Sequence, residues 1–178
     1  MIMMVSGGVQ GVVVPVVQDW PQGWSLDLTK FHGPNVVSCE VITNGKRTLL
    51  IFTLLPHFTQ ENVRAFEESL TCFWYQYPIV LGDLNTNILQ AQNPHSQQVA
   101  ELLMDFGLMD LLHHFRKWRR FQHINMWSQV RQGRLMRSRC DYILGTDRHR
   151  FKMVGIRGVI NYPSNHFALQ ARLLVGPM

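Results

Sequence analysis

The stretch Pro78-Ile-Val-Leu-Gly-Asp-Leu-Asn85 decides how the rest of this sequence is interpreted. Its apolar residues favour a short buried strand, and Asp83 and Asn85 follow directly after Gly82. Because residues i and i+2 of a strand point to the same face, we expect these two polar side chains to face outward together. Strands that carry polar groups at their carboxyl ends form phosphate and metal sites in α/β proteins. An ordinary strand that stops at a Gly-Asp turn is the alternative, and this stretch alone does not exclude it.

The composition indicates a globular protein. The chain has 178 residues, of which 46% are hydrophobic and 16% are charged. This is enough for one domain with a real core, and it excludes a disordered chain. Cys39, Cys72 and Cys140 show no C-x-x-C spacing, which argues against a structural zinc site or a disulfide framework. We expect each cysteine to behave as a small buried hydrophobe.

The N-terminal residues do not resemble an export signal, because no basic residue precedes the apolar run. The run 11–17 is far shorter than the roughly 20 residues that a membrane-spanning helix needs. We therefore expect a soluble protein that is intracellular, either nuclear or cytoplasmic, and that has no membrane partner.

The charge is divided unevenly along the chain. Residues 1–112 hold 4 basic and 10 acidic residues, a net charge of −6, and residues 113–178 hold 13 basic and 2 acidic residues, a net charge of +11. Such a basic half indicates either a polyanionic partner or an ordinary solvated charged face.

Hydrophobic periodicity predicts a single α/β domain over residues 1–178 with mixed or antiparallel sheets. Asn44-Gly45 predicts a hairpin between its flanking strands. Thr59 and Asn93-Pro94 are expected to begin two helices, and Gly107 to end the second one. Residues 19–33 are expected to be irregular. The expected strands are 9–17, 36–43, 47–55, 78–85, 123–130, 139–144, 151–160 and 167–175, with 131–138 as a basic hairpin tip.

Basic and aromatic side chains alternate in the segment Arg116–His123, whose sequence is RKWRRFQH. This pattern suits contacts with backbone phosphates and stacking on bases. An exposed loop whose aromatic residues pack inward is the equally weighted alternative. The candidate nucleic-acid-binding residues here and at the hairpin are Arg116, Lys117, Arg119, Arg120, Trp127, Arg134 and Arg137.

Two further polar pieces lie beside apolar strands. Asp141 precedes Tyr-Ile-Leu and His166 precedes Phe-Ala-Leu, so the two side chains could meet across neighbouring strands. A carboxylate beside an imidazole fixes its tautomer and raises its basicity, which makes the histidine usable against a phosphate. Asp83 and Asn85 would then supply a base and a hydrogen-bond donor on the opposite wall.

Three motifs in order carry a resemblance to a known family: GDLN at 82–85, RCDYIL at 139–144 and SNH at 164–166. They resemble those of the endonuclease/exonuclease/phosphatase superfamily, above all the apurinic-endonuclease-like domain of non-LTR retrotransposons. Gly7-Gly8-Val9, Leu54-Leu55-Pro56 and Trp127 support the likeness. The resemblance implies a DNase I-like two-sheet α/β sandwich that cleaves phosphodiester bonds of DNA with Mg²⁺ or Mn²⁺.

The resemblance also implies roles for individual residues. Asp83 would orient or deprotonate the attacking water, and Asn85 would hold a phosphate oxygen. Asp141 would orient His166, which would stabilise charge on the scissile phosphate. The metal would be held by Asp83, with a weak contribution from Asn165, which occupies the position of a metal-linked aspartate in the family.

The sequence also departs from the family pattern. An Asn-bearing strand and a Glu-bearing strand precede Gly7-Gly8-Val9 in the family, so we expect the sandwich to lack its first strands here. Asn165 replaces a carboxylate and Leu54 replaces a tyrosine. Mg²⁺ is held by carboxylates, so two lost ligands at about 10–100-fold each cost on the order of 10²–10⁴ in affinity or activity.

These departures leave several functions open. We expect a magnesium-dependent DNA endonuclease-like domain of retrotransposon origin whose activity is weakened or absent. The first alternative is a catalytically dead nucleic-acid-binding remnant, and the second is a fragment without selected activity. Lipid-phosphatase chemistry is a runner-up within the superfamily. The sequence does not define the DNA target or the oligomeric state.

Overall fold

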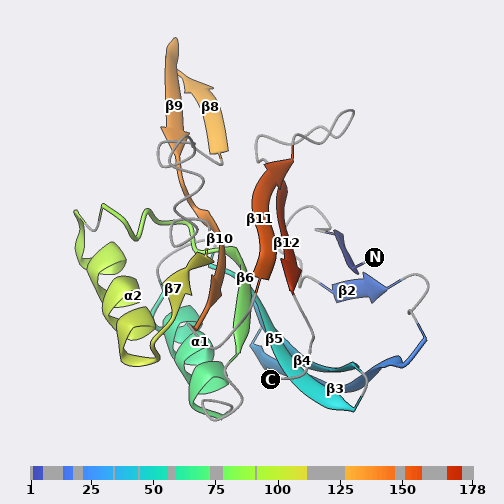
Figure 1. Ribbon diagram of the computed structural model, residues 1–178. Helices are drawn as coiled ribbons and strands as arrows, with labels where there is room; N and C mark the ends of the chain where they lie inside the picture. The colour runs from blue at the N-terminus through green and yellow to red at the C-terminus, as the bar shows by residue number, and fades with distance from the viewer. Residues whose placement is uncertain are drawn as a thin grey trace. The chain divides into compact units, whose positions relative to one another are not determined.

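The computed structural model describes residues 2–5, 14–17, 22–33, 35–43, 45–55, 59–72, 78–90, 92–111, 127–146, 151–157 and 168–173. Contacts divide the chain into two compact units, residues 1–82 and residues 83–178. Figure 1 draws the helices and strands of both units. No described helix is long and apolar enough to cross a membrane.

In the part of the first unit that the structure describes, the chain forms two groups of strands and one helix. Strands β1 and β2 form an antiparallel pair, and the larger group has the order β3-β4-β5-β6. Residues 6–13, which include part of the predicted strand 9–17, lie outside the described residues. The elements are β1 (Ile2–Val5), β2 (Val14–Val17), β3 (Trp24–Gly33), β4 (Val36–Thr43), β5 (Lys46–Leu54), α1 (Gln60–Cys72) and β6 (Ile79–Asp83).

Strand β4 forms the centre of this unit. Residues 36–41 are all buried, because β3 and β5 pair with the strand on its two edges and α1 contacts both β3 and β4. The predicted hairpin is confirmed: β4 and β5 pair antiparallel up to Thr43 and Lys46, around Gly45. The predicted helix start is also confirmed, since the Asn62 backbone N–H donates to Thr59 Oγ1 over 3.3 Å.

Strand β3 corrects the prediction that residues 19–33 are irregular. Its ten residues pair antiparallel with β4 from Trp24 to Gly33. Most of its side chains are exposed, including Leu26 and Phe31. Because few of its side chains are buried, its sequence lacks the alternation of apolar and polar residues that predicts a strand. Backbone hydrogen bonds to β4, which the local sequence does not reveal, form the strand instead.

The described residues of the second unit form one helix and three antiparallel strand pairs. These pairs are β7 with β10, β8 with β9, and β11 with β12, and β10 also contacts β12. Asn93 caps α2 by accepting from Ser96 N, as predicted for this helix start. The elements are α2 (Pro94–Asp105), β7 (Met109–Asp110), β8 (Trp127–Arg131), β9 (Arg134–Ser138), β10 (Asp141–Gly145), β11 (Phe151–Arg157) and β12 (Ala168–Leu173).

The β8–β9 hairpin corrects the prediction that residues 131–138 are a connecting tip (Figure 1). Arg131 pairs with Arg134, so the turn consists only of Gln132 and Gly133, whose φ angles are 49° and 73°. Two positive φ values match the two-residue turn that fits the twist of a hairpin. Residues 134–138 are therefore paired strand, and the basic residues lie on a regular ribbon.

Gly82 leaves no room for a side chain. Its φ is +152°, and a Cβ at this position would lie 1.8 Å from the Thr53 carbonyl oxygen on β5. Only glycine allows this close approach of two backbones. The residue that directly precedes Asp83 therefore has a fixed identity.

Gly82→Ala is expected to lower the free energy of unfolding by at least about 3 kcal/mol, because backbone strain alone costs about 1–3 kcal/mol and the contact forces strands apart. Gly45→Ala is the matched control: its φ is +79° with no atom within 4 Å of the added Cβ, so it should cost about 1–2 kcal/mol. Urea unfolding measures both. Equal stability of the two variants would contradict the close approach.

Candidate functional site

The polar end of β6 is shaped by Asp83 itself. Its Oδ1 accepts a hydrogen bond of 2.7 Å from the Asn85 backbone N–H. Asn85 has a φ of 51° and is exposed, and Asp83 is half-buried. Asn85 thus lies in a bend after the strand, which corrects the expectation that the two residues share a strand face. The turn begins at Asp83, and the loop 84–90 follows it.

Asp83 and Asp141 lie close together, although they come from separate motifs. The Leu84 N–H donates to the Cys140 carbonyl oxygen over 2.8 Å, which joins the residue after Asp83 to the residue before Asp141. Ligand atoms of Asp83, Cys140 and Asp141 all lie within 4.8 Å of one another. Within the described part of the chain, no other set of three such side chains is grouped in this way.

Cys140 lies between the two carboxylates as a neutral thiol. Its Sγ donates to Asp141 Oδ2 over 3.4 Å. Burial raises the pKa of the Cys140 thiol, and the charges of Asp141 and Asp83, with hydrogen bonds to both, raise it further. The thiol therefore stays protonated at neutral pH. Mg²⁺ prefers oxygen ligands, so the two carboxylates fit this ion and the thiol does not.

Several predicted residues are not located. His166, Asn165 and the basic residues Arg116, Lys117, Arg119 and Arg120 lie outside the described residues. The pairing of Asp141 with His166 therefore stays a prediction. Trp127 and Arg137 are placed only as backbone positions on β8 and β9, whereas Arg134 is an exposed residue of β9.

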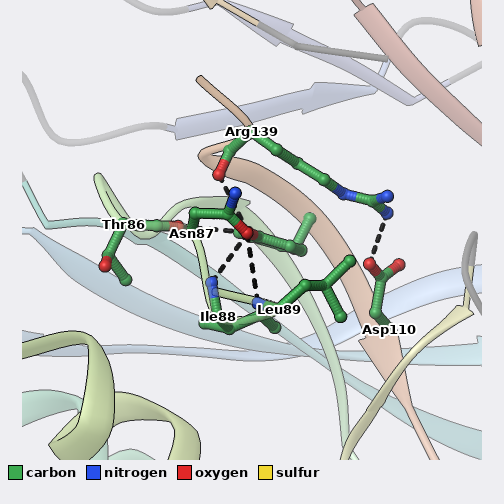
Figure 2. Close-up of polar contacts among 7 residues, drawn as sticks. Thr86, Asn87, Ile88, Leu89, Asp110 and Arg139 are labelled. Atoms are coloured by element: carbon green, nitrogen blue, oxygen red, sulfur yellow. Dashed lines mark hydrogen bonds and ion pairs between the residues drawn. The ribbon is translucent and has the colours of Figure 1, made fainter. Parts of the chain in front are cut away.

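Sequence reasoning missed the part played by Tyr142, which is 1% exposed. Its one O–H proton is shared between two carbonyl oxygens, that of Arg139 at 2.9 Å and that of Thr86 at 3.1 Å. The hydroxyl oxygen accepts from the Ile88 N–H over 3.1 Å. Figure 2 shows Thr86 and Ile88, which belong to the loop after Asp83, beside Arg139.

Sequence reasoning also missed the buried ion pair between Arg139 and Asp110 (Figure 2). Their side chains are 5% and 3% exposed, and the Arg139 guanidinium lies 5.6 Å from the centre of the Tyr142 ring. One signal was present: Asp110 interrupts the apolar run LMDLL, and charged residues are rarely buried without a partner. The sequence does not reveal which residue that partner is.

A concave region of about 450 Å³ lies in the first unit. It contains none of the predicted site residues. Cys72 lines it and is exposed, which corrects the expectation that all three cysteines are buried. Lys30 Nζ lies 3.8 Å from the Cys72 sulfur.

No family model and no curated protein sequence matches the chain. Among solved structures, the chain is similar to the endonuclease domain of TRAS1, a telomere-specific non-LTR retrotransposon, with a TM-score of 0.73 and 12% identity over 99% of this chain and 81% of that one. It is also similar to D. rerio TDP2 complexed with single-strand DNA product, with a TM-score of 0.51 and 15% identity over 77% of this chain and 60% of that one. For C. elegans TDP2 the TM-score is 0.57 and the identity 13%, over 92% and 53% of the two chains.

These similarities establish the fold of the chain. It is the mixed α/β, DNase I-like fold, as the motif resemblance implies. At 12–15% identity the likeness extends to the fold alone, because one fold supports many functions.

Asp110→Ala is expected to lower the free energy of unfolding by about 3–5 kcal/mol, because it leaves the buried Arg139 charge unpaired. The exposed Asp105 at the end of α2 is the matched control, and Asp105→Ala should change stability by less than about 0.5 kcal/mol.

The double variant Asp110→Leu with Arg139→Met should regain most of the stability, since apolar residues of similar volume replace such pairs at little cost. Chemical denaturation of the three variants tests this. An Asp110→Ala protein as stable as Asp105→Ala would refute the pairing.

Proposed function

We propose that this chain is a metal-dependent phosphodiesterase that acts on DNA. The convergence of the Asp83 and Asp141 carboxylates, from motifs far apart in the sequence, carries the proposal. The DNase I-like fold supports it, since solved structures with this fold include a retrotransposon endonuclease domain and a TDP2 complexed with single-strand DNA product.

The two carboxylates favour a divalent cation. Ionised carboxylates whose oxygens lie within 4.8 Å of each other repel by about 3 kcal/mol at an effective dielectric constant of about 20. The neutral Cys140 thiol cannot offset this repulsion, but a cation can. Asp83 and Asp141 would hold Mg²⁺ or Mn²⁺, with Asn165 as a weak further ligand. The bound ion would neutralise charge on the substrate phosphate.

The side chains divide the remaining tasks. Asp83 would accept a proton from the attacking water. The hydrogen bond from the Asn85 backbone N–H to Asp83 fixes the turn that carries Asn85, whose side-chain amide would donate to a phosphate oxygen. Asp141 would orient the His166 imidazole, and His166 would stabilise charge on the scissile phosphate. In this assignment Asp141 would both coordinate the metal ion and orient the His166 imidazole.

The β8–β9 hairpin would bind the DNA strand. Arg134 on β9 is exposed, and Val130 and Leu135, which pair across the two strands, are 66% and 54% exposed. A basic ribbon with exposed apolar side chains suits phosphate contacts beside contacts with bases. Trp127 and Arg137 share this ribbon, and Arg116, Lys117, Arg119 and Arg120 would extend the basic surface.

A catalytically dead DNA-binding protein is the second candidate. Asn165 stands where the resembling family has a carboxylate, which favours it. A loss of ligands weakens the binding of the metal ion but leaves the basic β8–β9 hairpin intact. Cleavage and binding must therefore be measured separately.

Supercoiled plasmid incubated with the purified protein and Mg²⁺ or Mn²⁺ should be nicked, and EDTA should abolish nicking. Asp83→Asn and His166→Ala should each slow it by about 10²–10⁴-fold, the usual contribution of a positioned acid or base. Asp105→Asn, a change at an exposed residue of α2, is the control and should nick like wild type. Equal nicking by His166→Ala and wild type would reject the enzymatic proposal.

DNA affinity should fall steeply with salt, because phosphate contacts release counterions. Arg134→Ala should weaken binding of all sequences and reduce the slope of log affinity against log salt by roughly 1. Arg64→Ala, a change at an exposed residue of α1, should leave the slope unchanged. Fluorescence anisotropy with labelled duplex DNA gives both values. Affinity that is the same at low and high salt would exclude phosphate-dominated binding.

A further inference from the structure

The loop 84–90 after Asp83 has no helix or strand of its own. Its internal hydrogen bonds are local: Leu89 N–H donates to Asn87 Oδ1 and Gln90 N–H donates to the Asn87 carbonyl oxygen, each over 3.1 Å. Such local bonds shape a loop but do not fix its position against the rest of a fold. Contacts with other elements must therefore do so, and those with residues 140–142 include three hydrogen bonds.

Three hydrogen bonds join this loop to the start of β10. Leu84 N–H donates to Cys140 O, Ile88 N–H donates to Tyr142 Oη, and the Tyr142 hydroxyl donates toward Thr86 O. Asp83 directly precedes the first of these loop residues, and Asp141 lies between Cys140 and Tyr142 in the chain. The bonds thus lie on both sides of Asp141, and they hold the stretch of chain that directly follows Asp83.

The Tyr142 hydroxyl is well suited to this task. A phenol hydroxyl can donate one hydrogen bond and accept another at the same time, and this one has an N–H donor and carbonyl acceptors within reach. Thr86 is buried and Ile88 is half-buried, so little water can replace a lost hydroxyl there. A backbone group buried without a partner is unfavourable, and the loop would have to move to find one.

The ion pair holds the tyrosine in turn. The guanidinium of Arg139 faces the Tyr142 ring, and a terminal nitrogen of the same guanidinium forms the ion pair with Asp110 on β7. The Arg139 carbonyl oxygen also accepts from the Tyr142 hydroxyl. A buried pair adds little stability compared with apolar residues of equal volume, so this pair is better explained by a role in geometry than by one in stability.

We propose that Tyr142 is a positioning residue for the Asp83–Asp141 metal site, and that the Arg139–Asp110 pair holds Tyr142 in place. The inference rests on the proposed function and deepens it, since it names the residues that set the distance between the two carboxylates. A small displacement of one ligand is enough to weaken such a site.

Tyr142→Phe tests the proposal, because it removes the hydroxyl and keeps the ring. Mn²⁺ affinity, measured by titration calorimetry, should fall about 10–100-fold, the usual effect of losing a group that supports a ligand. Amide exchange at Ile88 should accelerate, and kcat for nicking should fall while KM for DNA stays unchanged. Thr53→Val is the matched control: it removes a buried hydroxyl that has no hydrogen-bond partner among the described residues, and it should bind Mn²⁺ like wild type.

A Tyr142→Phe protein that loses stability but binds Mn²⁺ like wild type would overturn the positioning role and leave a structural one. If wild type binds Mn²⁺ without nicking DNA, the proposed function fails while the affinity comparison still decides the role of Tyr142. A wild-type protein that binds no Mn²⁺ overturns both.

A second variant covers the case in which Tyr142→Phe does not fold. Asp110→Leu with Arg139→Met keeps the tyrosine and replaces the ion pair by apolar residues of similar volume. It should fold, bind Mn²⁺ roughly 10-fold more weakly and exchange the Ile88 amide faster. Wild-type affinity in this folded variant would show that the pair does not hold the site.

Discussion

The hydrogen bond from Leu84 N–H to Cys140 O is the interaction on which the candidate site depends. It joins two chain segments at residues that adjoin Asp83 and Asp141, and so brings two carboxylates from separate motifs into one group. Carboxylates repel at this range, so side-chain attraction cannot assemble them. The backbone bond holds them together, and the protonated Cys140 thiol adds a donor without adding charge.

Much of this fold could be predicted because its signals are local. The Asn44-Gly45 hairpin, the Thr59 cap and the helix start at Asn93-Pro94 each need only a few adjacent residues, and the structure confirms all three. Strand β3 and the β8–β9 pairing were predicted wrongly. The exposed residues of β3 give no periodic signal of burial, and pairing partners are chosen by non-local backbone bonds that a local pattern does not encode.

In the candidate site, too, the residues in local motifs could be predicted and those with non-local roles could not. The motifs identified Asp83 and Asp141, because the resemblance supplied an order of residues that spacing alone could not. The sequence did not predict the roles of Tyr142, Asp110 and Arg139, because these roles arise from contacts between residues more than 25 positions apart. An aspartate in an apolar run signals a buried charge, but its partner becomes known only when β7 and β10 pair. The contacts of these three side chains thus depend on how distant segments pair, which residue type alone does not reveal.

Asp83 is constrained on both of its sides by different physics. Gly82 before it accepts no side chain, because its backbone approaches that of Thr53 too closely. The loop after it is held by the Tyr142 hydroxyl, which replaces backbone partners that an irregular loop lacks. A steric constraint of this kind tolerates no substitution, whereas a hydrogen bond can be lost while the fold persists. Changes at Gly82 should therefore affect folding first, and changes at Tyr142 should affect chemistry first. Substitutions at these two residues therefore distinguish what this region needs in order to fold from what it needs in order to function.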